Sequence, residues 1–413
     1  MENTAGPRSA LVWDDAFLNY RFSDTHPMNP VRLKLTHRLA KALGVLDRQR
    51  LMQLKPPLAT DAELATVHSI EYIAQVKAAS RDAESDDPTT FGNIARVYEA
   101  IGLGTEDCPV FADLHASSAR IAGGTLAAAK AVWHNEVDRA VNFAGGMHHA
   151  QRAAASGFCI YNDAALAIQW MLDHGAERIA YVDLDAHHGD GVEQAFWNDP
   201  RVLTISIHET GLLLFPGTGF AKDIGGPEAE GTAVNVAVPA SVSDAGYLRA
   251  AHAVVPQLLR AFQPQVLVTQ HGADGHRHDP LADLNLSVDG QRQLMLDARD
   301  WAEDFANGKW LALGGGGYSP MKVVPRAWAH LVAIAADTPI SPRTHIPQSW
   351  RELAAAELGL DTTDDVVTTM SDDVDVWWRS WEVGYDPADA TDQSIMATRK
   401  AVFPFHGLDP WFD

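Results

Sequence analysis

Three side chains that can bind a divalent metal ion alternate along one short segment. Asp183, Asp185 and His187 occupy every second position, directly after the apolar run 179–182, which has the composition of a buried strand. Because successive side chains of a strand point to opposite faces, this spacing predicts that all three lie on one face. Carboxylate and imidazole groups at the end of a strand favour a metal or ligand site at the carboxyl edge of a sheet.

Other chemically active side chains follow other apolar runs. His148 and His149 come after one such run and a Gly-Gly turn, and Asp274 comes shortly after another. Tyr318 directly follows four consecutive glycines, which are expected to let the phenol swing and approach its neighbours closely. The sequence therefore places two imidazoles, a carboxylate and a phenol at the ends of further expected strands.

These groups together meet the requirements of metal-assisted hydrolysis. We expect Asp185, His187 and Asp274 to bind the ion, because three protein ligands leave a position open for chemistry. The paired imidazoles are then free to act as general base and acid. Tyr318 can donate a hydrogen bond to the oxygen of a carbonyl group under attack. The residue types alone predict a hydrolase of an amide or a similar carbonyl compound.

The elements that must position these side chains alternate between strands and helices. This alternation predicts an α/β fold, a three-layer sandwich with a largely parallel central sheet. The expected strands are 11–13, 140–143, 179–182, 202–207, 234–238, 265–269 and 310–313. The expected helices are 31–43, 61–79, 117–133, 163–172, 244–262, 289–306 and 321–336. The pattern changes near 339, so we expect a catalytic domain over 1–340 and an extension over 341–413 packed on it.

The composition of the chain disfavours several classes of protein. The 413-residue chain has a formal net charge of -22, which disfavours binding to a nucleic acid backbone and favours cationic substrates. Two cysteines, Cys108 and Cys159, are too few for a disulfide framework or a cysteine-type zinc site. Residues 1–10 lack an apolar signal core, and no run of about 18 apolar residues occurs. The expectation is a cytoplasmic protein without membrane contact.

Several motifs in the same order resemble those of the zinc-dependent histone deacetylase superfamily. They lie at 26–32, 148–149, 157–163, 183–191, 215–219, 272–274 and 314–318. Within the superfamily, the chain is similar to the bacterial acetoin utilisation proteins, which are close to the class I deacetylases. The resemblance extends from about 13 to about 336 and implies an arginase/deacetylase-like fold.

The resemblance implies zinc-dependent hydrolysis of acetyl-lysine in proteins to lysine and acetate. It assigns zinc, or ferrous iron, to the three ligands proposed above. It places His148 and His149 beside the reacting water. Asp183 is expected to orient the first imidazole and Asp190 the second. His149 is expected to be the main proton-transfer residue, and Tyr318 to polarise the acetyl carbonyl.

The resemblance also implies a substrate tunnel. Its narrow walls for the acyl-lysine chain are expected to be Gly157, Phe158, Phe215 and Leu281. Asp107 corresponds to a rim aspartate that holds backbone amides of the substrate.

Two further sites depend on the resemblance. On residue type and helical position alone, Arg32 is expected to be a solvated surface charge, whereas the resemblance assigns it to an internal channel for acetate. A structural monovalent-cation site for K⁺ or Na⁺, built largely from backbone carbonyls, is expected at Asp183, Asp185, His187, Ser206 and Ile207.

The segment 275–279 departs from the eukaryotic class I pattern because it is rich in imidazole. Since it is expected at the rim, acetylated polyamines or other small acetylated amines form a second possible class of substrate. An arginase-like dimanganese hydrolase would need extra carboxylates beside Asp274, where the sequence has glycine, histidine and arginine. A non-catalytic acyl-lysine binder would lack a ligand, the His pair or the tyrosine, and none is missing.

Overall fold

The structure is a computed structural model that describes residues 8–85, 94–361, 363 and 366–413. Residues 1–7, part of the segment for which no signal core is expected, lie outside the described residues.

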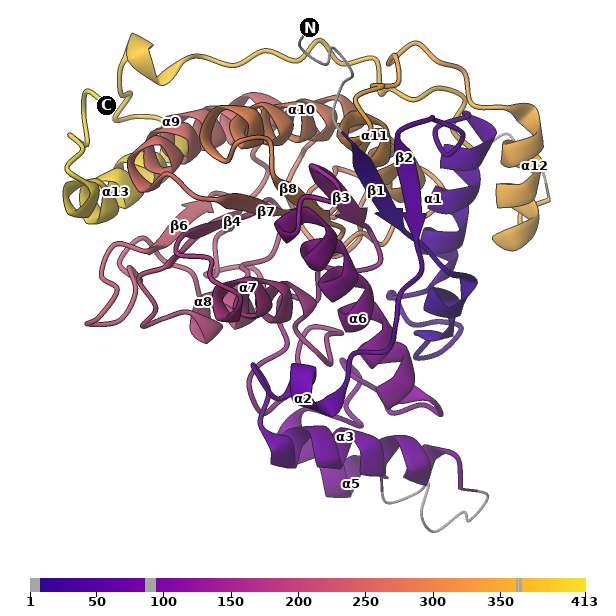
Figure 1. The fold of residues 1–413 in the computed structure, drawn as a ribbon. Coiled ribbons are helices and arrows are strands. Elements are labelled where there is room, and N and C mark those ends of the chain that lie inside the picture. Colours follow the sequence, from indigo (N-terminus) through magenta and orange to yellow (C-terminus); the bar gives the residue numbers. More distant parts are fainter. Residues whose placement is uncertain (1–7, 86–93, 362, 364–365) are drawn as a thin grey trace, which may run out of the picture.

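An eight-stranded parallel sheet forms the centre of the described chain (Figure 1). The strand order is β2-β1-β3-β8-β7-β4-β5-β6. Most of the strand residues are apolar and buried because helices cover both faces of the sheet. The strands are β1 (Ser9–Val12), β2 (Leu51–Leu54), β3 (Arg139–Asn142), β4 (Ile179–Asp183), β5 (Val202–Glu209), β6 (Ala233–Val238), β7 (Val266–Gln270) and β8 (Trp310–Leu313).

The helices form a layer on each face of the sheet (Figure 1), which confirms the predicted three-layer α/β class. One layer contains α1 (Val31–Ala42), α9 (Asp244–Phe262), α10 (Val288–Phe305), α11 (Val324–Ala335) and α13 (Ala390–Val402). The other layer contains α6 (Leu114–Trp133), α7 (Asp163–Asp173) and α8 (Asp190–Ala195). Beyond α6 and α7 lie the helices α2 (Asp61–Leu64), α3 (Ile70–Ala83) and α5 (Ile94–Tyr98).

The single helix predicted over 61–79 is wrong, because the chain forms α2 and α3 with a break between them. Thr60 caps α2, in a capping box with Glu63. Ser69 then starts a new helix by accepting a hydrogen bond from the backbone of Tyr72. Local capping by short polar side chains therefore overrides the helical periodicity of this segment.

The carboxyl-terminal residues run along the helical layer that contains α9, α10 and α11 (Figure 1). The extension begins with α12 (Gln348–Glu357), which packs on α1. There, the buried indole of Trp350 donates a hydrogen bond to the carbonyl of Leu35 at 3.0 Å. At the far end, the buried Arg249 of α9 forms an ion pair with Asp392 of α13. Both ends of the extension are thus tied to the rest of the chain through buried polar groups.

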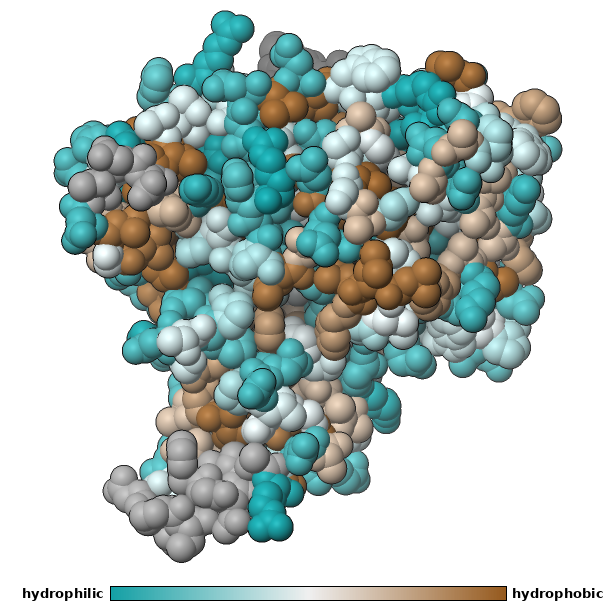
Figure 2. Space-filling model, turned by 180° about the vertical axis from the view of Figure 1, so that it is seen from behind, coloured by the Kyte–Doolittle hydropathy of each residue, from teal (hydrophilic) through white to brown (hydrophobic). Residues whose placement is uncertain are grey.

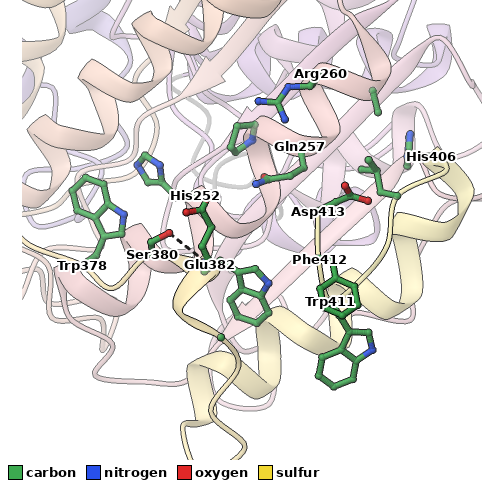
Figure 3. A pocket seen from close by; sticks show the side chains of 15 residues that line it. His252, Gln257, Arg260, Trp378, Ser380, Glu382, His406, Trp411, Phe412 and Asp413 are labelled. Carbon is green, nitrogen blue, oxygen red and sulfur yellow. Dashed lines mark hydrogen bonds between the residues drawn. The ribbon is translucent and has the colours of Figure 1, made fainter.

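A cavity of about 980 Å³ lies between α9 and the extension (Figure 3). Trp381 lines it, but the guanidinium groups of Arg249 and Arg399 already lie over its ring, at 4.8 and 5.0 Å from the centroid. Trp378 stacks on His252 at 4.6 Å between ring centroids. These aromatic rings therefore pack the extension onto α9, and the metal-capable side chains at the strand ends do not line this cavity.

Polar side chains cover most of the face seen in Figure 2, with apolar side chains gathered near its middle. Among the described helices, we find none that is both long and apolar enough to cross a membrane.

Trp350→Ala tests the attachment of α12. We expect this change to lower the free energy of unfolding by roughly 3–5 kcal/mol, because truncating a large buried side chain leaves a cavity. Urea unfolding followed by circular dichroism measures the difference. Trp377→Ala is the matched control, because that side chain is 71% exposed and its loss should change stability by less than about 0.5 kcal/mol. Equal effects of the two changes would contradict the expectation.

Candidate active site

The chemically active side chains meet where four adjacent parallel strands end. β3, β8, β7 and β4 are neighbours in the sheet, so the loops that follow them share one edge. Each loop contributes a different group, and every one of these groups except the half-buried phenol is buried. They are His148 and His149 after β3, Asp185 and His187 after β4, Asp274 after β7 and Tyr318 after β8.

The segment that contains the first two expected metal ligands is a turn rather than a continued strand. β4 ends at Asp183, whose carboxylate accepts a hydrogen bond from the backbone of Asp185 at 3.1 Å. The carboxylate of Asp185 accepts one from the backbone of His187 at 3.0 Å. Two successive aspartate turns therefore direct the alternating side chains. The predicted convergence of Asp185 and His187 is present, but the predicted strand geometry is wrong.

Asp185, His187 and Asp274 bring one ligand atom each to within 4.8 Å of one another. His187 Nδ1 lies 3.0 Å from Asp274 Oδ2 and 3.2 Å from Asp185 Oδ1. All three residues are buried. Two carboxylates and one imidazole are a donor set that suits Zn²⁺ or Fe²⁺ and leaves further coordination positions open. The residues present therefore fit a divalent ion.

The glycine run before Tyr318 is packed against the two carboxylates. The backbone of Gly316 donates a hydrogen bond to Asp185 Oδ2 at 2.7 Å. A Cβ atom on Gly316 would lie within 3.0 Å of Asp274 Oδ2, and each of the other three glycines of the run is similarly crowded. These glycines allow the backbone to approach the carboxylates, which differs from the mobility expected from the sequence.

Each imidazole of the pair is held by a carboxylate. His148 Nδ1 lies 2.8 Å from Asp183 Oδ2, and His149 Nδ1 lies 2.6 Å from Asp190 Oδ1. Because an ionised carboxylate only accepts hydrogen bonds, each Nδ1 is the donor, and Nε2 remains available for chemistry. The ring centroids are 4.0 Å apart. Both predicted pairings are present.

The charges around the two imidazoles separate their pKa values. Burial lowers the pKa of His148, but the charges of Asp183 and Asp185 outweigh it and raise the pKa to about 9. Burial and the neighbouring charge of His148 lower the pKa of His149 to about 4. The two imidazoles therefore differ in their affinity for a proton, which is a suitable arrangement for an acid and a base. Burial also raises the pKa of Tyr318, which keeps its phenol protonated.

A cavity of about 260 Å³ opens above these groups. Phe158 and Phe215 face into it: the first packs edge-on against Tyr318 and the second against His149, at 5.6 and 5.0 Å between ring centroids. A second, much smaller cavity of about 10 Å³ shares four lining residues with the first and also contacts Asp185. The full lining of the larger cavity is Asp107, His149, Gly157, Phe158, His187, Leu214, Phe215, Leu281 and Tyr318.

Asp107 and Arg32 contact two different loops of this arrangement. Asp107 lines the larger cavity and accepts a hydrogen bond from the backbone of Gly157 at 2.7 Å. Arg32 is only 3% exposed, so the expectation of a solvated surface charge is wrong. Its guanidinium donates to the carbonyl groups of Gly315 and Gly317, beneath the loop that leads to Tyr318. A charge on an amphipathic helix is buried here because backbone carbonyls of a distant loop stabilise it.

The residues expected to surround a monovalent cation come from two paired strands and the turn after β4. Asp183 and Ser206 are partners in the register of β4 and β5, and Ile207 follows on β5. Ser206 Oγ lies 2.8 Å from Nδ1 of His208. The structure therefore brings Asp183 and Ser206 together.

Sequence reasoning missed several side chains that support the site. Tyr181 donates to Asp183 at 2.6 Å, and Gln151 donates to Asp190 at 2.8 Å. Tyr181 precedes Asp183 by two positions, so strand periodicity could have identified it. Asp279 accepts a hydrogen bond from the backbone of Tyr318 at 2.7 Å, and no local pattern connects these two residues.

Comparisons with known proteins agree with this geometry. The sequence profile of the histone deacetylase domain matches residues 26–335. The acetoin utilization protein AcuC of Bacillus subtilis (strain 168) is 39% identical over 343 residues, covering 83% of this chain and 85% of that protein. The protein of the same name from Staphylococcus xylosus is 34% identical over 370 residues, covering 88% of this chain and 92% of that protein.

Two solved structures share the fold. A histone deacetylase homologue in complex with SAHA has a TM-score of 0.79, and a homologue from Aquifex aeolicus has a TM-score of 0.78. Each is 28% identical and covers 95% of this chain and 100% of the other. With the domain match and the bacterial relatives, these likenesses show that the chain belongs to the histone deacetylase family.

Proposed function

We propose that this protein is a metal-dependent deacetylase that hydrolyses the acetyl amide of acetyl-lysine in proteins and releases acetate. One observation carries the proposal. Asp185, His187 and Asp274 converge beside an apolar cavity, next to a carboxylate-oriented His pair and Tyr318. Membership of the deacetylase family supplies the class of reaction. The substrate, the metal and the role of each residue are part of this proposal.

Asp185, His187 and Asp274 are proposed to hold Zn²⁺, with Fe²⁺ as the second candidate. When bound, such an ion polarises water and the acyl carbonyl as a Lewis acid. Gly316 supports this assignment, because its backbone donates a hydrogen bond to Asp185 and its lack of a side chain leaves room for Asp274 Oδ2. The protein's contribution here is to hold two like charges and one imidazole in a fixed arrangement.

His149 is proposed as the main proton-transfer residue. It lines the larger cavity, whereas His148 is absent from that lining. His149 Nε2 would take a proton from the attacking water as its oxygen bonds to the acyl carbon. The C–N bond then breaks as this proton passes to the amide nitrogen, which gives acetic acid and the neutral amine. Transfer of the carboxyl proton to the amine then leaves acetate and the lysine ammonium. His148, with its raised pKa, would supply positive charge beside the reacting atoms.

Tyr318 is proposed to donate a hydrogen bond to the acyl oxygen as negative charge develops on it. Its protonated phenol and its place in the cavity lining support this role. Arg32 is proposed to guide acetate away from the smaller cavity, because its buried guanidinium lies beneath the same loop. The monovalent-cation site at Asp183, Asp185, His187, Ser206 and Ile207 remains part of the proposal.

The walls of the cavity favour the chain of an acyl-lysine. Gly157, Phe158, Phe215 and Leu281 are proposed to contact its four methylene groups, and the one carboxylate of the lining, Asp107, already accepts a hydrogen bond from the backbone of Gly157. A polyamine has further ammonium groups along its chain, and these would need such a partner. Asp107, which lines the cavity, is proposed to accept hydrogen bonds from backbone amides of the substrate. Of the candidate substrates, only a polypeptide provides such amides.

The loop before Phe215 adds support for a polypeptide. Leu212 and Leu213 are 78% and 71% exposed and immediately precede Leu214 and Phe215, which line the cavity. The backbone groups of Leu213 and Leu214 both donate to the carbonyl of Thr210, so a hydrogen-bonded turn fixes this loop. Two solvent-exposed apolar side chains beside the cavity can contact apolar residues that are next to the acyl-lysine in the substrate sequence.

Asp274→Asn tests the metal ligands. We expect the variant to lose most of its bound metal, because a neutral amide is a poor replacement for a carboxylate ligand. Metal content after dialysis, measured by mass spectrometry, checks this. Asp300→Asn, at a largely exposed carboxylate, should retain the metal. Full occupancy in Asp274→Asn would contradict the ligand assignment.

Tyr318→Phe tests the carbonyl-polarising group. The variant should lose roughly 10²–10³-fold in kcat while keeping its metal, by comparison with the loss of one oxyanion donor. Steady-state kinetics with an acetyl-lysine peptide, together with metal analysis, provides the measurement. Unchanged turnover would remove Tyr318 from the chemical step.

A comparison of substrates tests the polypeptide reading. The set is an acetyl-lysine peptide with leucine beside the modified residue, the same peptide with serine there, Nε-acetyl-lysine and N-acetylspermidine. We expect the leucine peptide to have the highest kcat/KM, by about 10-fold or more over the small amines.

The double variant Leu212→Ser/Leu213→Ser should remove the preference for leucine over serine. Val383→Ser is the matched control, because Val383 is 71% exposed but lies on the extension. A higher kcat/KM for acetylspermidine would instead identify a small acetylated amine as the substrate.

A further inference from the structure

The carboxylate of Asp372, on the extension, is surrounded by donors from the catalytic domain. Its Oδ2 accepts hydrogen bonds from His276 Nε2 at 2.7 Å and from the backbone of Val288 at 3.0 Å. Its Oδ1 accepts one from Arg326 Nη2 at 2.7 Å. Arg277 lies 3.4 Å away. The side chain of Asp372 is only 9% exposed, so these donors replace most of its water.

The backbone of Asp372 is held as firmly as its side chain. Its N–H donates to Asp289 Oδ2 at 2.8 Å, and the N–H of Val374 donates to the same oxygen at 3.2 Å. Arg326 also donates to the carbonyl of Ser371 at 2.9 Å. The segment 371–374 is therefore fixed at the beginning of α10, where a carboxylate also interacts favourably with the positive end of the helix.

From Asp372, a chain of hydrogen bonds leads to Tyr318. The buried His276 donates to Asp372 through Nε2 and accepts through Nδ1 from the backbone of His278 at 3.0 Å. The carbonyl of His276 accepts from the backbone of Asp279 at 2.8 Å. Asp279 in turn accepts from the backbone of Tyr318 at 2.7 Å. Each link lies within ordinary hydrogen-bond distance.

The same loop also shapes the cavity. Asp279 Oδ1 accepts a hydrogen bond from the backbone of Leu281, which lines the cavity together with Phe158 and Phe215. On its other side, the loop is joined to Leu286 through the backbone of Arg277 at 3.0 Å. The loop therefore has two anchors, one in the catalytic domain and one in the extension.

We propose that Asp372 is a positioning residue for the active site: through His276 and Asp279 it fixes the backbone that carries Tyr318. This inference rests on the proposed deacetylase activity. Asp372 does not touch the substrate cavity and lies outside the residues matched by the domain profile, 26–335. Removing its charge should displace the phenol without removing a metal ligand. A displacement of about 1 Å is enough to cost up to 10²-fold in rate.

The experiment compares Asp372→Asn with a second variant in the extension, Asp392→Asn. Asp392 is also a buried aspartate of the extension and is paired with Arg249 and Arg379, but it has no hydrogen bond to the active-site loop. Both variants should lower the melting temperature. We expect Asp372→Asn to reduce kcat for an acetyl-lysine peptide by roughly 10–100-fold with metal retained, and Asp392→Asn to leave kcat within about twofold of wild type.

A double-mutant cycle separates positioning from general destabilisation. If Asp372 acts through Tyr318, Asp372→Asn should reduce kcat much less in a Tyr318→Phe background than in the wild type, because the group that it positions is already lost. Additive effects of the two changes would overturn the inference. Loss of metal from Asp372→Asn would also overturn the inference, and so would equal kcat values for Asp372→Asn and Asp392→Asn.

His276→Gln provides an independent test, which decides the matter if Asp372→Asn does not fold. This change removes the imidazole that links Asp372 to the loop before Tyr318, but it leaves the ion pair of Asp372 with Arg326. The same loss of kcat is expected, and wild-type kcat would overturn the inference. Absence of any deacetylase activity in the wild-type protein would instead contradict the proposed function.

Discussion

The burial of two carboxylates side by side is the constraint on which the rest of this site depends. Asp185 and Asp274 are removed from water, and burial together with the charge of Asp185 raises the pKa of Asp274 to about 6. Such a pair is stable only with donors and positive charge close by. His187 lies between the carboxylates, and backbone N–H groups of Gly316 and Ala186 complete their hydrogen bonds. The glycine run and the convergence of neighbouring strands follow from this requirement, because bulkier residues would separate the backbone from the carboxylates.

The cavity above this polar centre has the opposite character. Phenylalanine and leucine side chains form its walls, while the imidazoles and the phenol lie at one end. An apolar wall lowers the local dielectric constant around the reacting groups, which strengthens each hydrogen bond to developing charge. Pairing each imidazole with one carboxylate also fixes which ring nitrogen is available for chemistry. In the proposed mechanism, substrate selection and proton transfer are thus separated along one cavity.

Much of this arrangement could be predicted from the sequence because it depends on short-range patterns. Apolar runs between helical periodicities predicted the parallel sheet, and polar residues after those runs predicted which side chains meet: the proposed metal ligands, the imidazoles and Tyr318. The exceptions depend on contacts between distant residues or on local hydrogen bonds that compete with periodicity. Arg32 is buried because carbonyl groups nearly 300 positions away accept from it. The break before α3 and the aspartate turns after β4 result from side chains that bond to nearby backbone. The contact between Asp372 and His276 spans 96 positions and leaves no local signal.

The strand order has a consequence for how the chain reaches this structure. β8 is the last strand in the sequence, yet it lies between β3 and β7 near the middle of the sheet. Until residues 310–313 have been synthesised and inserted, the two strands beside them each present an unpaired edge. Such edges are templates for pairing with other chains, and parallel pairing between distant segments is slow. Both half-sheets therefore present an open edge while residues 271–313 are being added, which makes this part of synthesis a stage at which the protein is exposed to aggregation.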